Sequence, residues 1–392
     1  MKKRLLAALM VATMAISVAA CSKSDDSEVA DNDKKEKTTT VNDIEVNVED
    51  YVTLGEYKGI EVTLEGEYEY TEDGFYDYVQ DTISSEALFV EDSSQTEIKE
   101  DSIVNVDYVG SQDGVAFDGG SAEDQMIDVA NNSSAGSMSG YIDGFTAGLV
   151  GHSVGEEVAY DVTFPENYQS EALAGQTVVF TFQVNYIAKA IESKSDLTDE
   201  IVSENFGYDT VDDYIDFLKE QYTSELESNL ESDKETAVLN SIINNSTVSE
   251  VPEDLLQARV DLILYTQDLQ YQAYGITMKE YAEAMGYDYD EVVASLTDEV
   301  REQTEIQMIL EAIAKAEGIE VDEDGYKEFI TPFYTQLGYA DEASLYDAFS
   351  VEGYSGEKYF NLAYLTEKAT DFCVENAVVS FSDGEAQDSE AQ

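Results

Sequence analysis

The pattern of apolar and polar residues changes once along this chain, near residue 195. From about residue 51 to residue 190, apolar residues alternate with polar ones, as over residues 103–108 and 178–184. A period of two is typical of strands that have one buried face. Turn residues such as Asp113 and Gly114 separate these runs. The first part of the chain is therefore predicted to consist mainly of strands.

The remaining apolar residues recur at helical spacing. One helix is expected early, over residues 71–87, where apolar residues recur every three or four positions. Beyond residue 195, apolar stripes of this kind run through residues 211–222 and 292–313. Pro252 is expected to open a helix and Gly318 to end one, because each residue is well tolerated at that position. The second part of the chain is therefore predicted to be all-α.

The first twenty residues have the layout of a secretion signal. Lys2, Lys3 and Arg4 precede an apolar run over residues 5–20, which is short for a membrane-spanning helix. The run ends in small residues before Cys21, and this end resembles the lipobox of bacterial lipoproteins. The resemblance implies cleavage before Cys21 and a diacylglycerol on its sulfur, with two acyl chains to hold the membrane. The alternative is a plain cleaved signal followed by a chance cysteine.

Composition excludes several classes of function. Acidic residues outnumber basic ones 85 to 20, for a net charge of −65, which argues against nucleic acid and the ribosome as partners. The single His152 excludes histidine-based metal sites and Ser-His-Asp catalysis. If Cys21 is lipidated, Cys373 has no partner for an internal disulfide. No cofactor is predicted, and the acidic runs 288–290 and 322–325 lack the ligand spacing of a calcium loop.

Six stretches of the strand-rich part resemble, in order, the motifs of the FKBP-type peptidyl-prolyl isomerase domain found in trigger factor. They are residues 106–110 (VDYVG), 113–120 (DGVAFDGG), 141–145 (YIDGF), 148–156 (GLVGHSVGE), 162–168 (VTFPENY) and the last strand up to residue 184. Residues 52–62 resemble the segment that enters this domain. Residues 197–200, 251–252 and 309–319 resemble the helical, substrate-cradling domain of trigger factor. The resemblance spans residues 51–376, without the ribosome-binding domain.

This resemblance implies an α+β multidomain protein. The expected parts are an FKBP-like curved antiparallel sheet with a short helix, and an all-α chaperone domain of the trigger factor or SurA type. The predicted organisation is a lipoprotein signal peptide (1–20), a disordered tether from the lipidated cysteine (21–45), a linker strand and helix (46–95), the isomerase domain (96–190), the helical chaperone domain (191–380) and an acidic tail (381–392).

Isomerisation of an X-Pro bond needs a pocket and no covalent step. The barrier is about 18–20 kcal/mol, and a dry aromatic cleft that favours the twisted amide lowers it. The resemblance implies six wall residues, namely Tyr108, Phe117, Ile142, Phe145, Tyr168 and Phe182. It also implies that Asp118 and the Tyr168 hydroxyl contact substrate carbonyls and that the N–H of Ile142 anchors the peptide.

Two departures from the family pattern border this cleft. Gln125 stands where the family usually has an aromatic wall residue, and the loop over residues 131–140 is longer than usual. Both could weaken or redirect catalysis. Without the ordered motifs, the same aromatic residues would be read as ordinary core.

The resemblance implies a membrane-anchored isomerase and chaperone on the extracytoplasmic face. Its partners would be unfolded or proline-containing exported polypeptides. One alternative is a catalytically weak or inactive holdase that binds unfolded exported chains through its helical domain, which the altered cleft rim favours. The other is a lipoprotein that binds a single envelope partner, which a helical domain without an exposed apolar patch would favour.

Overall fold

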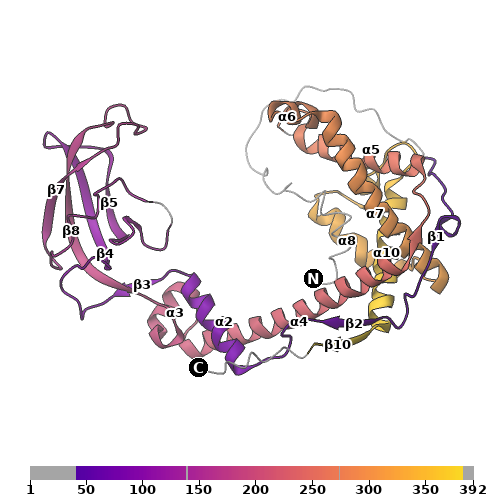
Figure 1. Cartoon of the computed structure of the whole chain (residues 1–392), viewed down its shortest axis with the longest axis horizontal. Helices are drawn as coiled ribbons and strands as arrows, with labels where there is room; N and C mark the ends of the chain where they lie inside the picture. The colour runs from indigo at the N-terminus through magenta and orange to yellow at the C-terminus, as the bar shows by residue number, and fades with distance from the viewer. Residues whose placement is uncertain (1–40, 138–139, 273, 383–392) are drawn as a thin grey trace, which may run out of the picture. The chain divides into compact units, whose positions relative to one another are not determined.

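The computed structural model describes residues 41–137, 140–272 and 274–382. The predicted signal peptide, Cys21, nearly all of the tether and nearly all of the acidic tail lie outside these residues. The described chain forms two compact units, which we call the sheet unit, residues 69–226, and the helical unit, residues 41–68 and 227–382 (Figure 1). The predicted succession of a strand-rich part and an all-α part is confirmed.

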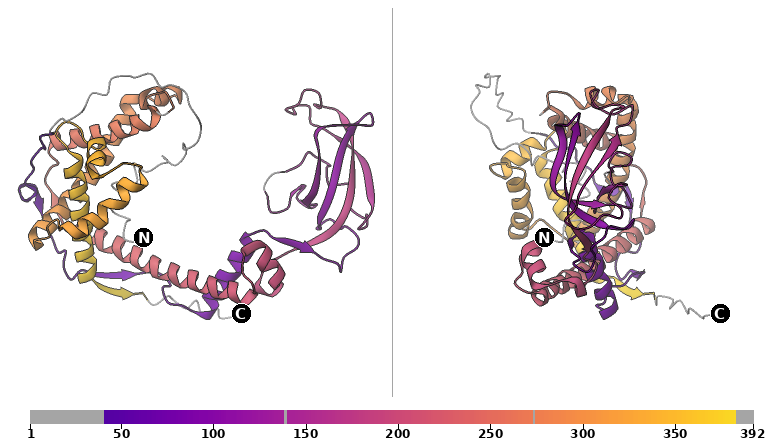
Figure 2. Two further views of the ribbon diagram at one scale, coloured as in Figure 1. Left: turned by 180° about the vertical axis from the view of Figure 1, so that it is seen from behind. Right: turned by 90° about the vertical axis from the view of Figure 1, so that its left-hand side faces the viewer.

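The sheet unit is built on six strands. In spatial order β3 (Phe89–Glu91), β8 (Thr177–Ala190), β4 (Ile103–Gln112), β5 (Val115–Asp128) and β6 (Ser133–Ser134) are antiparallel neighbours. The remaining strand, β7 (Glu157–Thr163), pairs with residues 177–183 of β8. The strands lie side by side in the right-hand view of Figure 2. Because β8 pairs with β4, β7 and β3, it is the central strand of the sheet.

Local sequence signals explain this sheet. Asp113 and Gly114 have φ angles of 51° and 81°, so they form a tight turn of the primed kind that matches the twist of the β4–β5 hairpin. In β8, buried residues alternate with more exposed ones from Val178 to Val184. These buried side chains form one face of the sheet and its core. The period of two thus predicted which face of the strand is buried.

Three α-helices and one 3-10 helix add a second core to the sheet unit. The early helix is present as α2 (Glu72–Ser85), and the Thr71 hydroxyl caps it by accepting from the N–H of Gly74 at 3.1 Å. It packs with α3 (Asp199–Phe206), the 3-10 helix η2 (Lys194–Asp196) and the first part of α4 (Val211–Asn245). The fully buried Ile83 and Val202 lie in this core. Helices on both sides of the predicted 190/191 boundary therefore belong to the sheet unit.

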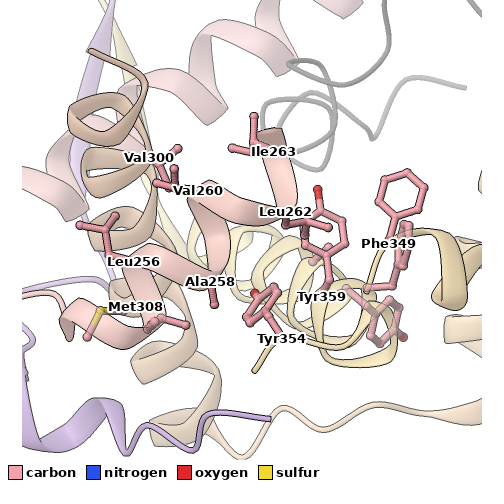
Figure 3. Close-up of a cluster of buried hydrophobic side chains, with 14 of the residues drawn as sticks. Leu256, Ala258, Val260, Leu262, Ile263, Val300, Met308, Phe349, Tyr354 and Tyr359 are labelled. Carbon is pink, nitrogen blue, oxygen red and sulfur yellow. The ribbon is translucent and has the colours of Figure 1, made fainter. Parts of the chain in front are cut away.

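The helical unit contains the remainder of α4 and six further helices. They are α5 (Glu253–Gln272), α6 (Met278–Ala284), α7 (Tyr289–Glu317), α8 (Glu323–Gln336), α9 (Glu342–Ala348) and α10 (Gly356–Asn376). Figure 3 shows Leu256 of α5, Val300 of α7 and Tyr359 of α10 gathered in its core. Pro252 directly precedes α5, and Gly318 ends α7 with a φ of 67°, as predicted. Arg259 is buried in α5.

The first described segment is part of the helical unit. Strand β1 (Val52–Thr53) pairs with β9 (Thr247–Val248), and β2 (Glu61–Leu64) pairs in parallel with β10 (Val378–Phe381). Between the unit's helices, the 3-10 helix η1 (Val48–Asp50) and Ile60 bury apolar side chains in two cores. A segment expected to lead into the isomerase domain therefore completes the other unit. Across the described ranges, no helix is long and apolar enough to span a membrane.

Candidate active site

The sheet unit brings five of the predicted cleft residues into one cluster, which we call the aromatic basin. Its predicted members are Tyr108, Phe117, Ile142, Phe145 and Phe182. The ring centroid of Phe145 lies 5.1 Å from that of Tyr108 and 5.1 Å from that of Phe182. Phe180 joins the basin with its centroid 4.9 Å from that of Phe145. These residues come from β4, β5, β8 and the segment of consecutive turns between β6 and β7.

Depth divides the basin into a base and a rim. Phe145 is 3% exposed and Phe182 is 0% exposed, so both form the base. Tyr108, Phe117 and Ile142 are half-buried and form the rim. A ligand would touch the rim residues first and would reach Phe145 only if a covering ring moved.

Two glycines make the seat of Phe117. A Cβ atom added to Gly110 of β4 would lie 2.5 Å from the Phe117 ring, and one added to Gly120 of β5 would lie 2.3 Å from it. Real Cβ atoms do not approach this closely, so no larger residue fits while the ring stays in place. The motif glycines therefore position an aromatic side chain at the rim of the basin.

The two predicted polar contacts lie on the exposed side of the unit. Asp118 follows Phe117 in β5 and is exposed. Tyr168 is 37% exposed, and its ring packs 4.6 Å from that of Phe164, which in turn lies 6.0 Å from Phe117. Tyr168 is thus connected to the basin through Phe164. Both side chains are accessible to a peptide.

The predicted peptide anchor is held by a side chain in the long loop. Asn132 donates from Nδ2 to the carbonyl oxygens of Tyr141 at 3.1 Å and Ile142 at 3.0 Å, and accepts from the N–H of Thr146 at 3.1 Å. The Tyr141 carbonyl and the Ile142 N–H belong to the same peptide unit. Asn132 therefore fixes the orientation of the N–H that the resemblance assigns to substrate binding.

Sequence reasoning missed two residues of the basin, Phe180 and Tyr141. The ring of Tyr141 stacks on Phe145 with centroids 4.4 Å apart and planes at 25°, and its hydroxyl lies 2.9 Å from that of Ser134. The available signal was its place directly before Ile142. Gln125, which departs from the family pattern, lies opposite Val106 in the β4–β5 register and is half-buried. Its Nε2 donates to the Glu123 carbonyl at 2.9 Å.

The electrostatics of the basin favour neutral hydroxyl groups. Burial raises the pKa of Tyr108, and the nearby Tyr141 raises it further. Burial also raises the pKa of Tyr160, whose ring stacks 5.3 Å from Phe182. Both phenols therefore stay protonated at neutral pH, and the Tyr160 hydroxyl donates a hydrogen bond to the Phe145 carbonyl. Such a site suits amide rotation, which needs shape and fixed dipoles rather than a charged acid or base.

Two other residues considered in the sequence, His152 and Cys373, lie in ordinary structural settings. His152 forms a local pair with Glu156, Nδ1 to Oε1 at 3.1 Å, and the Ser153 N–H and His152 lower the pKa of Glu156. Cys373 is buried, and burial raises its pKa to about 12. Among the residues that the structure describes, no three His, Cys, Asp or Glu side chains are grouped to hold a metal ion.

Fold and site together define a protein with an FKBP-type domain and a separate helical domain. Residues 94–185 match the family of FKBP-type peptidyl-prolyl cis-trans isomerases, and residues 210–375 match the C-terminus of bacterial trigger factor. The chain is therefore trigger factor-like, with both of these domains in the order expected from the sequence.

Individual relatives agree with the two family matches. The trigger factor of Halothermothrix orenii is 30% identical over 71% of this chain, and that of Staphylococcus saprophyticus is 32% identical over 74%. The chain spans only 62% and 63% of the lengths of these two relatives. The trigger factor of Clostridioides difficile is 28% identical over 86% of this chain and 75% of its own length.

Among solved structures, the chain is similar to "Promiscuous Substrate Recognition in Folding and Assembly Activities of the Trigger Factor Chaperone". It aligns with 83% of this chain and 72% of its own, at 13% identity and a TM-score of 0.39. The relationship therefore rests on the sequence matches and not on this superposition.

Proposed function

We propose that this protein is a membrane-anchored peptidyl-prolyl isomerase and chaperone that assists the folding of exported polypeptides. The observation that carries the isomerase part is the aromatic basin, in which Phe117 sits in its two-glycine seat, 6.0 Å from Phe180, in the cluster that also contains buried Phe145 and Phe182. An X-Pro segment would bind with its prolyl ring in the basin. The Ile142 N–H, Asp118 and the Tyr168 hydroxyl would contact the peptide backbone.

The basin would accelerate rotation without covalent chemistry. Its aromatic walls exclude water from the amide, which favours the less polar, twisted form over the planar one. Neutral donors on the rim can hold the substrate carbonyls while the C–N bond turns. Exchange NMR of a short X-Pro peptide tests this directly. Acceleration by the wild-type protein and its loss in Phe117→Ala and Asp118→Ala would support the assignment, whereas no acceleration by folded wild-type protein would refute it.

An exposed apolar surface of the helical unit supports the chaperone part. We call it the α6 patch, and its members are Leu269, Tyr274, Tyr281, Met285 and Tyr287, with exposed fractions from 41% to 79%. They lie at the end of α5, on α6 and in the adjoining turns (Figure 1). The patch is held by defined structure, because α6 begins with a capping box formed by Thr277 and Glu280. Exposed apolar side chains that lie close together along the chain offer contact area to an unfolded client.

Suppression of client aggregation tests the patch. The double variant Met285→Ser/Tyr287→Ser is expected to protect an unfolded client less well than wild type. Both side chains are exposed, so the fold should keep its stability to within about 0.5 kcal/mol. Tyr76→Ser is the matched control, because Tyr76 is 61% exposed in the sheet unit. Equal protection by the double variant and the control would remove the patch from the proposal.

The anchor and the location follow from the sequence of the first residues. The basic start, the apolar run and Cys21 support lipidation, and a lipidated protein would act on the outer face of the cell membrane. Metabolic labelling with a fatty-acid analogue tests this step. Label that appears in the wild-type protein and disappears in Cys21→Ser is expected. Unlabelled wild-type protein that is recovered in a soluble fraction would contradict the anchor.

The holdase alternative keeps two observations in its favour. Tyr141 covers one face of Phe145, and Gln125 stands where the family usually has an aromatic wall residue. In that alternative the basin is catalytically weak or inactive, and the helical unit binds unfolded exported chains. In that case the wild-type protein would suppress aggregation and leave the exchange rate of the X-Pro peptide unchanged.

A further inference from the structure

The contacts of Tyr141 hold its ring against the base of the basin. Its backbone N–H donates to the carbonyl of Asn132 at 2.8 Å, and Asn132 Nδ2 donates back to the Tyr141 carbonyl at 3.1 Å. The Ser134 hydroxyl shares a 2.9 Å hydrogen bond with the Tyr141 hydroxyl. Backbone and side chain are therefore both positioned by the segment that precedes them.

The ring of Tyr141 occupies space that a ligand would need. It stacks on one face of Phe145, while Tyr108, Phe180 and Phe182 pack around the same ring with centroids 4.9 to 5.1 Å away. These neighbours leave Phe145 only 3% exposed. A prolyl ring can therefore contact Phe145 only if one of these rings moves. Tyr141 is the half-buried ring that stacks on the face of Phe145, with planes at 25°.

We propose that Tyr141 is a specificity-determining residue of the basin, whose ring covers Phe145 in the free protein and must be displaced by the prolyl ring of a bound peptide. This inference rests on the proposed isomerase site. Displacement of the Tyr141 ring breaks its stacking contact with Phe145 and its hydrogen bond to Ser134. Only peptides whose contacts in the basin exceed that loss would bind well.

The expected size of the effect follows from the two contacts. One aromatic pair and one neutral hydrogen bond together correspond to roughly a tenfold change in an equilibrium constant. Tyr141→Ala is therefore expected to lower KM for a short X-Pro peptide about tenfold. The covering ring opposes substrate and transition state equally, so kcat should stay unchanged. Ser134→Ala removes the hydrogen bond alone and should lower KM by roughly threefold.

The experiment measures KM and kcat by exchange NMR over a range of peptide concentrations, and the dissociation constant by chemical-shift titration. It uses the full chain of wild type, Tyr141→Ala and Ser134→Ala. Tyr76→Ala is the control, since it removes an exposed tyrosine from α2 of the same unit. Lower KM and tighter binding in both variants, with an unchanged control, is the expected result.

Two results would overturn the role of Tyr141. Weaker binding in Tyr141→Ala would mean that the ring contacts the peptide itself, and an unchanged dissociation constant in both variants would mean that it does not compete. Either outcome overturns the inference while leaving isomerisation by the wild type intact. Tighter binding in the variants with no acceleration by any protein would instead uphold the covering ring and refute the isomerase.

Discussion

The Tyr160 hydroxyl lies 2.5 Å from the backbone carbonyl oxygen of Phe145 and donates a hydrogen bond to it. Tyr160 belongs to β7 and Phe145 to the turns before it, so this bond ties the base of the basin to the sheet. The Tyr160 ring also stacks on Phe182. A Cβ atom added to Gly148 would lie 2.4 Å from the Tyr160 ring, so no larger residue fits there while the ring stays in place. Tyr160 is thus a support of the basin that a peptide does not need to touch.

Tyr160→Phe should loosen that support without changing the shape of the core. Loss of one hydrogen bond of this kind costs about 1 kcal/mol, which corresponds to roughly fivefold faster opening. Hydrogen exchange of the β7 and β8 amides measures it. Tyr168→Phe, which alters an exposed ring, is the control. Equal exchange in the two variants would show that the Tyr160 bond does not stabilise the sheet unit.

Gly120→Ala tests the seat of Phe117. The added methyl group would lie 2.3 Å from the ring, so Phe117 must leave the rim. We expect the acceleration of X-Pro exchange to fall at least tenfold, because the substrate loses a wall of the basin. The exposed neighbour Ser121 supplies the matched control, Ser121→Ala, which should behave as wild type. Wild-type catalysis by a folded Gly120→Ala protein would exclude Phe117 from the site.

The sequence predicted much of this architecture because its signals are local. The alternation around Val104 and Val178 identified strands, and Pro252 and Gly318 identified the beginning and the end of helices, since each signal acts within a few residues of its position. Five of the residues that the ordered motifs assign to the cleft lie in one cluster.

Contacts between distant segments could not be predicted in the same way. The pairing of β2 with β10 joins residues more than 300 positions apart, and nothing in the local pattern of either strand names its partner. The position of Tyr141 depends on a hydroxyl from Ser134 and on the face of Phe145, both of which become neighbours only in the folded chain. The spacing of apolar residues along the chain identifies which face of an element is buried, but it does not identify the side chains that cover this face.

Ile60→Ala tests whether the first described segment stabilises the helical unit. Ile60 is 4% exposed and lies in a core with Ile309 and Cys373. Truncating a buried isoleucine typically costs about 2–5 kcal/mol. Faster hydrogen exchange in α7 and α10, with an unchanged sheet unit, is expected. The neighbouring exposed Glu61→Ala serves as the control. Destabilisation confined to the sheet unit would contradict the assignment of this segment.

The pH dependence of the helical unit should carry a contribution from Glu311. Burial raises its pKa, against the opposing effects of Lys358, Lys315 and Arg259. The folded state therefore holds this proton more tightly than the unfolded state, whose pKa is about 4.3. The corresponding stability is fully present below the unfolded pKa and is lost as pH rises through the raised folded-state pKa.

Glu311→Gln removes this titration. Relative to wild type, the variant should gain stability between pH 4 and pH 7, as measured by calorimetric unfolding of the full chain. The exposed Glu302 of the same helix provides the control Glu302→Gln. The same pH profile for wild type and Glu311→Gln would show that Glu311 titrates alike in both states.

The most direct test of the account is the refolding of a protein whose rate is limited by a prolyl bond. The wild-type chain is expected to accelerate it. Phe117→Ala should abolish the acceleration. With Met285→Ser/Tyr287→Ser, the protein client should refold more slowly than with the wild-type chain, whereas a short X-Pro peptide should exchange at the wild-type rate. This pattern would show that the basin catalyses and that the α6 patch delivers the client. Refolding that the wild-type chain does not accelerate, in a client shown to bind it, would contradict the central claim.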